Sequence, residues 1–282
     1  MTEIDLNDLP QWSSWPARLL GLTQWNAPVR TLEKVDQEYD KDKYAKCLAH
    51  YIDTGRKATP EEVKQFEFGF NGTVCVSLGN SLVLMSLDEA RLRFYSLLAN
   101  TMRHEIEQSV TVIELGCGYG YNLWILMRQF EGKEFRGGEY SLNAVRLASH
   151  LFAMYSGIRI SQFNFYDRSC EILESIQEPV TIFTVHALEQ LRDTTFFFDT
   201  LWQYRRKVRA VFHFEPLYEN HDETLLGLMR KRYSEINDYN CDLVTQLKQR
   251  SEMIRLIHIE ADVLGLNPLN PTSVIHWEFV SQ

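Results

Sequence analysis

The sequence contains no apolar run that approaches the roughly 20 residues needed for a membrane-spanning helix. Its first residues, MTEIDLNDLPQWSSW, are acidic and interrupted by Pro10, whereas a secretory signal peptide begins with basic residues followed by an apolar stretch. The usual signals for membrane insertion and secretion are therefore missing. We expect no membrane partner and a cytoplasmic location.

Closely spaced cysteines are also absent. The five cysteines lie far apart, and none belongs to a C-x-x-C pair or a His/Cys cluster. A disulfide framework needs paired cysteines, and a structural zinc site needs ligands at short, regular spacings. We therefore expect neither a metal site nor disulfide bonds, and we expect a reducing compartment.

The sequence has no basic stripe. Its 29 Lys and Arg residues are outnumbered by 38 Asp and Glu residues, and the net charge of −9 is spread along the chain. Binding to a nucleic-acid backbone requires clustered positive charge, so we expect no nucleic-acid partner. With 282 residues, of which 45% are hydrophobic, the chain can form one α/β domain with an elaboration.

The most informative stretch that is present is VTVIELGCGYG, residues 110–120. Apolar and β-branched residues lead to Glu114 and are followed by Gly116, Gly118 and Gly120 at alternate positions. This pattern predicts a buried strand that ends in a tight turn. Because glycine has no Cβ, backbone N–H groups in such a turn can approach a ligand closely. The sequence therefore predicts a nucleotide- or nucleoside-binding corner of an α/β sheet.

Predicted strands and helices alternate from residue 110 onward. Strands are expected at 110–115, 134–139, 158–164, 180–185 and 209–214, and helices at 121–130, 142–155, 169–177 and 193–207. Such alternation is typical of a parallel sheet with helices on both faces.

The pattern changes near the end of the chain. A helical insert is expected at about 221–251, followed by strands at 254–259 and 274–280. Because no helix joins these two strands, they should pair antiparallel at the sheet edge. The expected fold class for residues 107–282 is α/β, a doubly wound, mostly parallel seven-stranded sheet with a C-terminal antiparallel hairpin.

Residues 1–106 predict an arm followed by a mostly helical cap. The arm contains Trp12, Trp15 and Trp25 among prolines that argue against one long helix. We expect the arm to wrap on its own domain, with a homodimer formed through the arm as the alternative. In the cap, helices are expected at about 42–51, from Thr59 onward and at 86–106, with a hairpin at 73–85.

The glycine spacing separates two kinds of cofactor. A dinucleotide fingerprint has the pattern G-x-G-x-x-G, whereas the third glycine here comes one residue early. With Glu114 before Gly116, Gly118 and Gly120, the stretch resembles the first motif of class I S-adenosylmethionine-dependent methyltransferases, E/D-x-G-x-G-x-G. The resemblance covers about residues 40–282. It implies a Rossmann-like domain, S-adenosyl-L-methionine as cofactor and an enzyme that transfers a methyl group.

The resemblance also implies roles for residues at successive strand ends. Glu114 would lie near the ammonium group of the cofactor, and Glu139 would accept hydrogen bonds from the ribose hydroxyls. Asp167 would accept a bond from the adenine amino group, with Tyr166 or Phe165 beside the adenine face.

Two further segments are expected to close the site. In the family a tyrosine covers the methionine end of the cofactor, and EYDKDKY offers Tyr39 and Tyr44 for this role. In the helical insert, Tyr233 and Asn237 are candidates for closing the acceptor pocket, and a solvated helix is the alternative.

The acceptor should lie near the loops after the fourth and fifth strands, because ligands of open α/β sheets bind beyond the carboxyl ends of the strands. The first loop, VHALEQL, resembles the family's x-x-L-E-H, with Gln190 where histidine is common. His186 is therefore the candidate catalytic base, or else a structural histidine, and Glu189 is expected to bind substrate. In the second loop, Glu215 is the other catalytic candidate and Tyr218 is expected to bind substrate.

Three functions remain open. The first is a methyltransferase acting on an oxygen or nitrogen of a small polar acceptor, such as a sugar or natural-product intermediate. The second is a peptide or protein methyltransferase, which would need an open groove. The third is an inactive cofactor-binding module that acts through the tryptophan-rich arm. A nicotinamide dehydrogenase is disfavoured by the glycine spacing.

Overall fold

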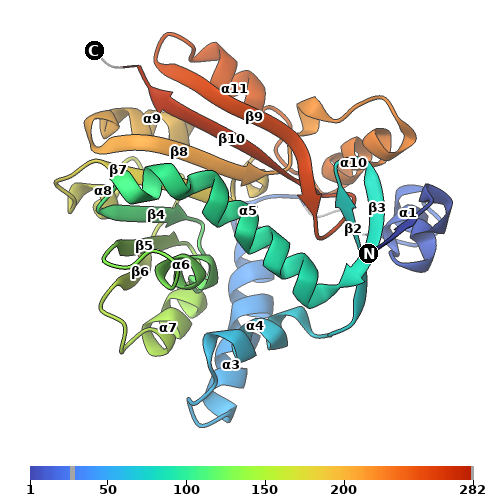
Figure 1. Cartoon of the computed structure of the whole chain (residues 1–282), viewed down its shortest axis with the longest axis horizontal. Helices are drawn as coiled ribbons and strands as arrows, with labels where there is room; N and C mark the ends of the chain where they lie inside the picture. Colours follow the sequence, from blue (N-terminus) through green and yellow to red (C-terminus); the bar gives the residue numbers. More distant parts are fainter. Residues whose placement is uncertain (26–28, 281–282) are drawn as a thin grey trace.

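The computed structural model describes residues 1–25 and 29–280, in which ten strands form one mixed sheet (Figure 1). The strand order is β1-β3-β2-β9-β10-β8-β7-β4-β5-β6. The parallel part consists of β6 (Ile158–Gln162), β5 (Glu134–Glu139), β4 (Thr111–Leu115), β7 (Val180–Val185) and β8 (Val208–Glu215). The expected doubly wound, mostly parallel α/β fold is confirmed.

The C-terminal hairpin is inside the sheet rather than at its edge. β10 (Thr272–Phe279) pairs antiparallel with both β8 and β9 (Ile254–Gly265). The end of β9 then pairs with β2 (Thr73–Leu78), and β3 (Ser81–Ser86) and β1 (Thr2–Ile4) continue the sheet. The hairpin expected at 73–85 therefore adds to the same sheet, and the described residues contain ten strands instead of the expected seven.

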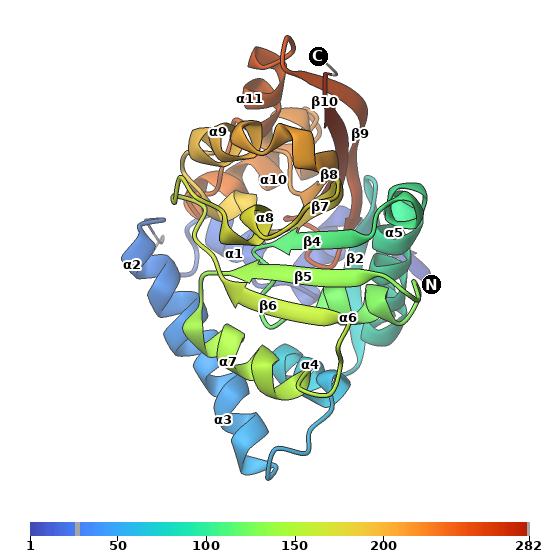
Figure 2. The same cartoon turned by 90° about the vertical axis from the view of Figure 1, so that its left-hand side faces the viewer.

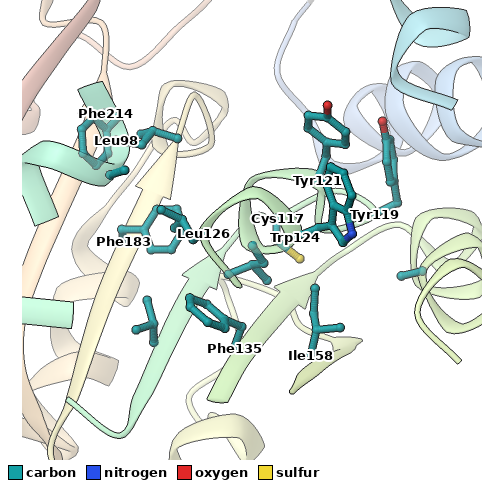
Figure 3. Close-up of a cluster of buried hydrophobic side chains, with 14 of the residues drawn as sticks. Leu98, Cys117, Tyr119, Tyr121, Trp124, Leu126, Phe135, Ile158, Phe183 and Phe214 are labelled. Atoms are coloured by element: carbon teal, nitrogen blue, oxygen red, sulfur yellow. The ribbon is translucent and has the colours of Figure 1, made fainter. Parts of the chain in front are cut away.

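The two faces of the sheet carry separate hydrophobic clusters. Neighbouring residues of β4 alternate between them, since Val112 belongs to one cluster and Ile113 to the other. The first cluster also includes side chains of α6 (Tyr121–Met127) and α7 (Leu142–Leu151), and Figure 3 shows part of it, including Trp124 and Phe135. The second includes α8 (Glu171–Glu174), α9 (Thr195–Gln203) and α11 (Leu243–Gln249).

The helical insert is divided. α10 (Leu225–Ile236) ends at Asn237, and Asp238 has a positive φ of 54° that an α-helix cannot accommodate. The chain then continues to a second, short helix, α11. Three further 3₁₀ turns complete this half of the chain: η3 (Leu188–Gln190), η4 (Arg205–Lys207) and η5 (Tyr218–Asn220).

The N-terminal part carries most of the cap helices. They are η1 (Leu6–Gln11), α1 (Trp15–Leu19), α2 (Leu32–Val35), the π-helix η2 (Asp36–Tyr44), α3 (Ala45–Asp53), α4 (Pro60–Phe68) and α5 (Leu87–Gln108). The sequence signals for two starts are confirmed: Thr59 and Glu62 form a capping box on α4, and the side chain of Ser86 caps α5. In Figure 1, α5 crosses in front of the sheet.

The arm packs on its own chain. The rings of Trp15 and Tyr233 meet edge to face with their centroids 4.5 Å apart, and Leu9 is buried in the same cluster. Trp12 and Trp25 stay partly exposed. The division of the chain at residues 106 and 107 stays a prediction.

No helix within residues 1–25 and 29–280 is both long enough and apolar enough to cross a membrane.

Candidate active site

A cavity of about 590 Å³ lies at the carboxyl ends of the parallel strands. In Figure 2 the arrowheads of β5 and β6 point to the side of the molecule on which α2 lies, and residues of α2 and η2 line the cavity together with the strand-end loops. The cavity brings together many of the residues expected at the site: Glu114, Gly116, Gly118, Glu139, Tyr166, Tyr44, His186, Glu189 and Tyr233. A cavity of this size is typical of a small-ligand site.

The glycine turn after β4 forms one wall of the cavity. Gly116 and Gly118 have φ values of 78° and 55°, a conformation that favours glycine. A Cβ at Gly116 would collide with Ala187, and a Cβ at Gly118 would collide with the hydroxyl of Tyr44. The turn therefore has no room for a side chain at either position.

Gly120 has a different role from the one expected. It does not line the cavity, and it begins α6 with a φ of 86°. A Cβ at this position would collide with Ile160 of β6. Gly120 is therefore required for the packing of the turn against the sheet, not for contact with a ligand.

Glu114 is a buried carboxylate with an unused oxygen. It is only 1% exposed, and Asn122 Nδ2 donates to its Oε1 at 2.7 Å. Its Oε2 has no hydrogen-bond partner among the described residues. Burial raises the pKa of Glu114 to about 8. A cationic group in the cavity would supply the missing partner.

Glu139 ends β5 beside the glycine turn. Its Oε2 accepts a bond from the backbone N–H of Gly118 at 2.7 Å, and its Oε1 accepts one from that of Ser141 at 2.8 Å. Burial raises the pKa of Glu139, although these bonds oppose the shift. Because each carboxylate oxygen has two lone pairs, both can still accept a hydroxyl donor.

Asp167 is not brought to the cavity. Its side chain is exposed, because the chain turns earlier: Asn164 Oδ1 accepts a bond from the backbone N–H of Tyr166 at 3.1 Å. Asn164, Phe165 and Tyr166 line the cavity in place of Asp167. The asparagine that precedes two aromatic residues in NFYD was the available sequence signal for this turn.

The π-helix η2 covers the cavity with Tyr39 and Tyr44. Asp40 fastens it to the start of α7: its Oδ1 accepts bonds from Ser141 Oγ at 2.7 Å and from the backbone N–H of Asn143 at 2.8 Å. π-Helical turns are rare and are found frequently at functional sites. Both lid tyrosines expected from the sequence therefore lie at the cavity.

A partly buried ion cluster beside the cavity joins this lid to α4. Glu67 of α4 accepts from Lys43 and Lys64, both at 2.8 Å, and from the hydroxyl of Tyr119 at 3.1 Å. Burial opposes ionisation, but the two lysines lower the pKa of Glu67. Lys64 and Glu67 lie one turn apart on α4, but Lys43 belongs to η2 and Tyr119 to the glycine turn, so the sequence offered no signal for the complete cluster.

His186 is held by hydrogen bonds on both ring nitrogens. Nδ1 lies 3.2 Å from Glu189 Oε2, and Nε2 lies 2.7 Å from Thr272 Oγ1. Burial lowers the pKa of His186, but the negative charges of Glu189 and Glu215 raise this pKa by more, so the net shift is upward. Its φ of 48° is uncommon for a residue with a side chain, and such strain is concentrated at functional sites.

Glu215 does not face the cavity. It is 1% exposed, and its two oxygens accept bonds from the backbone N–H groups of Ala187, Leu188 and Glu189 at 2.9–3.3 Å. Burial raises the pKa of Glu215 to about 7. The carboxylate therefore shapes the loop after β7, and the catalytic role expected from the sequence is not supported.

Two residues expected to bind substrate also lie elsewhere. The hydroxyl of Tyr218 donates to Glu235 at 2.9 Å, outside the cavity. Asn237 Nδ2 donates to the backbone oxygen of Tyr233 at 2.8 Å, and this bond ends α10. Instead, the loop between β9 and β10 contributes lining residues that sequence reasoning missed: Leu266, Asn267, Asn270 and Thr272.

Comparisons with known proteins give structural neighbours only. No family model and no curated protein matches the sequence. Similar solved structures include the methyltransferase domain of bacterial CtHen1-C (17% identity, 69% of this chain and 100% of that chain, TM-score 0.47). Another is magnesium protoporphyrin IX methyltransferase from Synechocystis PCC 6803 (11% identity, 69% of this chain and 86% of that chain, TM-score 0.48). A third is geranyl diphosphate C-methyltransferase from Streptomyces coelicolor A3(2) (12% identity, 67% of this chain and 80% of that chain, TM-score 0.45).

Proposed function

We propose that the protein is an S-adenosyl-L-methionine-dependent methyltransferase that acts on an oxygen or nitrogen of a small polar acceptor. The observation that carries the proposal is the wall formed by Glu114, the glycine turn and Glu139 at the ends of adjacent strands β4 and β5. One carboxylate there has an unused oxygen, and the turn has no room for side chains.

The residues present fit this cofactor. Glu114 would hold its ammonium group, Gly116 and Gly118 would lie against the nucleoside, and Glu139 would accept from the ribose hydroxyls. Asn164 would replace Asp167 as the partner of the adenine edge. When bound, S-adenosyl-L-methionine supplies a methyl group on a positively charged sulfur.

The acceptor would lie between the glycine turn and the loops that carry His186 and Tyr233. A group that loses a proton during the reaction needs a base within hydrogen-bonding reach. His186 offers an imidazole in this part of the cavity, and Glu189, 3.2 Å from its Nδ1, stabilises the charged form. Tyr233 would close the pocket from α10.

The partial cover over the cavity favours a small acceptor over a peptide or protein. Leu32, Val35 and Tyr39 line the cavity from the N-terminal side, so this side is not an open groove such as a peptide or protein acceptor would require. An inactive cofactor-binding module would bind the cofactor without turnover of any acceptor and would form a stable complex through the arm.

A homodimer through the arm stays a prediction, as do a cytoplasmic location and the absence of a nucleic-acid partner. Leu20 and Leu22 are 74% and 78% exposed, so the arm retains apolar surface. If this surface forms a dimer, replacing both leucines by serine should halve the mass measured by light scattering. A monomeric mass for the unmodified protein would exclude the dimer.

Binding of the cofactor product S-adenosylhomocysteine is expected to release protons. The pKa of Glu114 is about 8 in the free protein, so Glu114 is mostly protonated at pH 7. A bound ammonium group favours the ionised carboxylate and lowers this pKa, so up to about one proton should leave the protein between pH 5 and pH 8. Above pH 9 the release should vanish, because Glu114 is already ionised.

Isothermal titration calorimetry in buffers of different ionisation enthalpy measures this release. Glu114→Gln should bind more weakly and release fewer protons. A control is Glu215→Gln, because Glu215 is buried and has a raised pKa but does not line the cavity. Proton uptake, or the same release in Glu114→Gln, would contradict the role of Glu114. If S-adenosylhomocysteine did not bind at all, the proposed function itself would be contradicted.

A further inference from the structure

The carboxylate of Glu189 contacts several side chains in the part of the cavity where the methyl acceptor would bind. Its Oε2 faces His186 Nδ1 at 3.2 Å and accepts from Asn270 Nδ2 at 3.0 Å, and its Oε1 accepts from Gln190 Nε2 at 2.9 Å. Glu189 is 6% exposed, and all four residues line the cavity. One buried group thus contacts three side chains of the same wall.

Each contact fixes the orientation of a side chain. An ionised carboxylate only accepts hydrogen bonds, so both amides must turn their nitrogens toward Glu189. Their oxygens, Gln190 Oε1 and Asn270 Oδ1, then point elsewhere, and both are buried with no hydrogen-bond partner among residues 1–25 and 29–280. Buried polar atoms without a partner are uncommon in folded proteins.

The same reasoning assigns the proton on His186. Because Nδ1 faces the carboxylate, Nδ1 carries the hydrogen in the neutral ring, and Nε2 has the free lone pair. Nε2 lies 2.7 Å from Thr272 Oγ1, so the Thr272 hydroxyl donates to it. The Thr272 oxygen retains lone pairs that can accept a further hydrogen bond.

Glu189 therefore leaves the oxygen of Thr272, a residue that lines the cavity, free to accept a hydrogen bond from a ligand. A ligand group that bonds to this oxygen must supply a donor, and a hydroxyl group supplies one without adding charge. We propose that the substrate group to be methylated is a hydroxyl and that it binds at Thr272, which passes its proton to His186. The inference rests on the proposed function and names the substrate class and a further catalytic residue for it.

The proton transfer at Thr272 is balanced. The proton of the substrate hydroxyl passes to Thr272 Oγ while the Thr272 proton passes to His186 Nε2, and the electron pair of the broken O–H bond stays on the substrate oxygen. The resulting imidazolium is held by the Glu189 carboxylate. It returns its extra proton to water after the product leaves.

The arrangement around Glu189 is tested first in the ligand-free protein by ¹⁵N NMR of labelled histidines. The chain has eight histidines, and His186→Gln identifies the signal of His186 by its loss. We expect the neutral ring to be protonated at Nδ1. In Glu189→Gln the pKa of His186 should fall and the tautomer should change, whereas Glu189→Asp should retain part of the shift.

The matched control is Glu235→Gln, which removes the same charge from a residue that does not line the cavity. A neutral ring protonated at Nε2, or an unchanged His186 pKa in Glu189→Gln, would overturn the arrangement. This readout needs neither cofactor nor substrate, so it stands apart from the proposed function.

The substrate class is tested with ¹⁴C-methyl-labelled S-adenosylmethionine and a panel of monosaccharides, alkyl glycosides, nucleosides and primary amines. We expect transfer to a hydroxyl-bearing compound, with a methyl ether as the product. Transfer to an amine, or no transfer to any hydroxyl-bearing compound while S-adenosylhomocysteine still binds, would overturn the proposal. If S-adenosylhomocysteine failed to bind, that result would instead contradict the proposed function.

Thr272 is tested with two variants of similar size. Thr272→Val removes the hydroxyl and should lower kcat roughly 10²-fold or more with little change in the Kd of S-adenosylhomocysteine. Thr272→Ser keeps the hydroxyl and should retain most of the activity. Equal activity of the two variants would show that the hydroxyl takes no part in the proton transfer.

Discussion

Glu139→Ala is expected to weaken binding of S-adenosylhomocysteine by roughly 10²- to 10⁴-fold. The ribose hydroxyls would donate two charge-assisted bonds to this carboxylate, and each contributes about 1.5–3 kcal/mol, or about 3–6 kcal/mol together. The low exposure of Glu139 keeps water from replacing these bonds. The measurement is the Kd from isothermal titration at fixed pH and salt.

Two further variants make this result specific. Asp167→Ala should leave the Kd unchanged, because Asp167 is exposed and outside the cavity, whereas Asn164→Ala should weaken binding. Because Glu139 also accepts from two backbone N–H groups, circular dichroism must show that Glu139→Ala keeps its fold. An unchanged Kd for a folded Glu139→Ala protein would refute the ribose role.

Arg230→Met is expected to destabilise the protein by about 3–5 kcal/mol. Arg230 is fully buried, and its guanidinium donates to the backbone oxygens of Pro268 and Gly79 and to Asp262 Oδ2, at 2.8–3.0 Å. Removing the cation leaves Asp262 buried beside His221 without its charge partner, and breaking a buried pair costs more than the pair contributes. Urea unfolding measures the difference.

Arg232→Met provides a matched control from the same helix. The Arg232 side chain is 57% exposed and pairs with Glu235, so its loss should change stability by no more than about 0.5 kcal/mol. Equal effects of the two variants would show that the Arg230 network is dispensable. Because Arg230 holds Pro268, Arg230→Met should also disturb the neighbouring cavity residues Asn267 and Asn270.

Local patterns in the sequence are sufficient to predict the central part of the fold and about half of the residues of the candidate site. Alternating strands and helices require a parallel sheet, and parallel strands place their carboxyl ends at one edge. Glu114 and Glu139 are therefore predicted to lie together from their positions at two strand ends. The same reasoning applies to His186 and Glu189, which follow β7.

What sequence reasoning missed depends on contacts between distant segments. The pairing of Ser77 with Gly265 joins the N-terminal hairpin to the sheet, and no local pattern specifies that partner. The roles expected for Asp167 and Glu215 depend on the family resemblance after the third strand and on the position of Glu215 at the end of the fifth strand. Their orientation instead depends on an asparagine turn and on the backbone N–H groups of another loop. Thr272 comes close to His186 only because β10 lies next to β8.

The attachment of η2 affects how a ligand would enter and leave. Ser141 donates through its backbone to Glu139 and through its hydroxyl to Asp40, so one residue links the wall of the cavity to its cover. A ligand held at Glu139 would therefore stabilise the closed cover that encloses it. Release of the ligand would then require the contact between Ser141 and Asp40 to open.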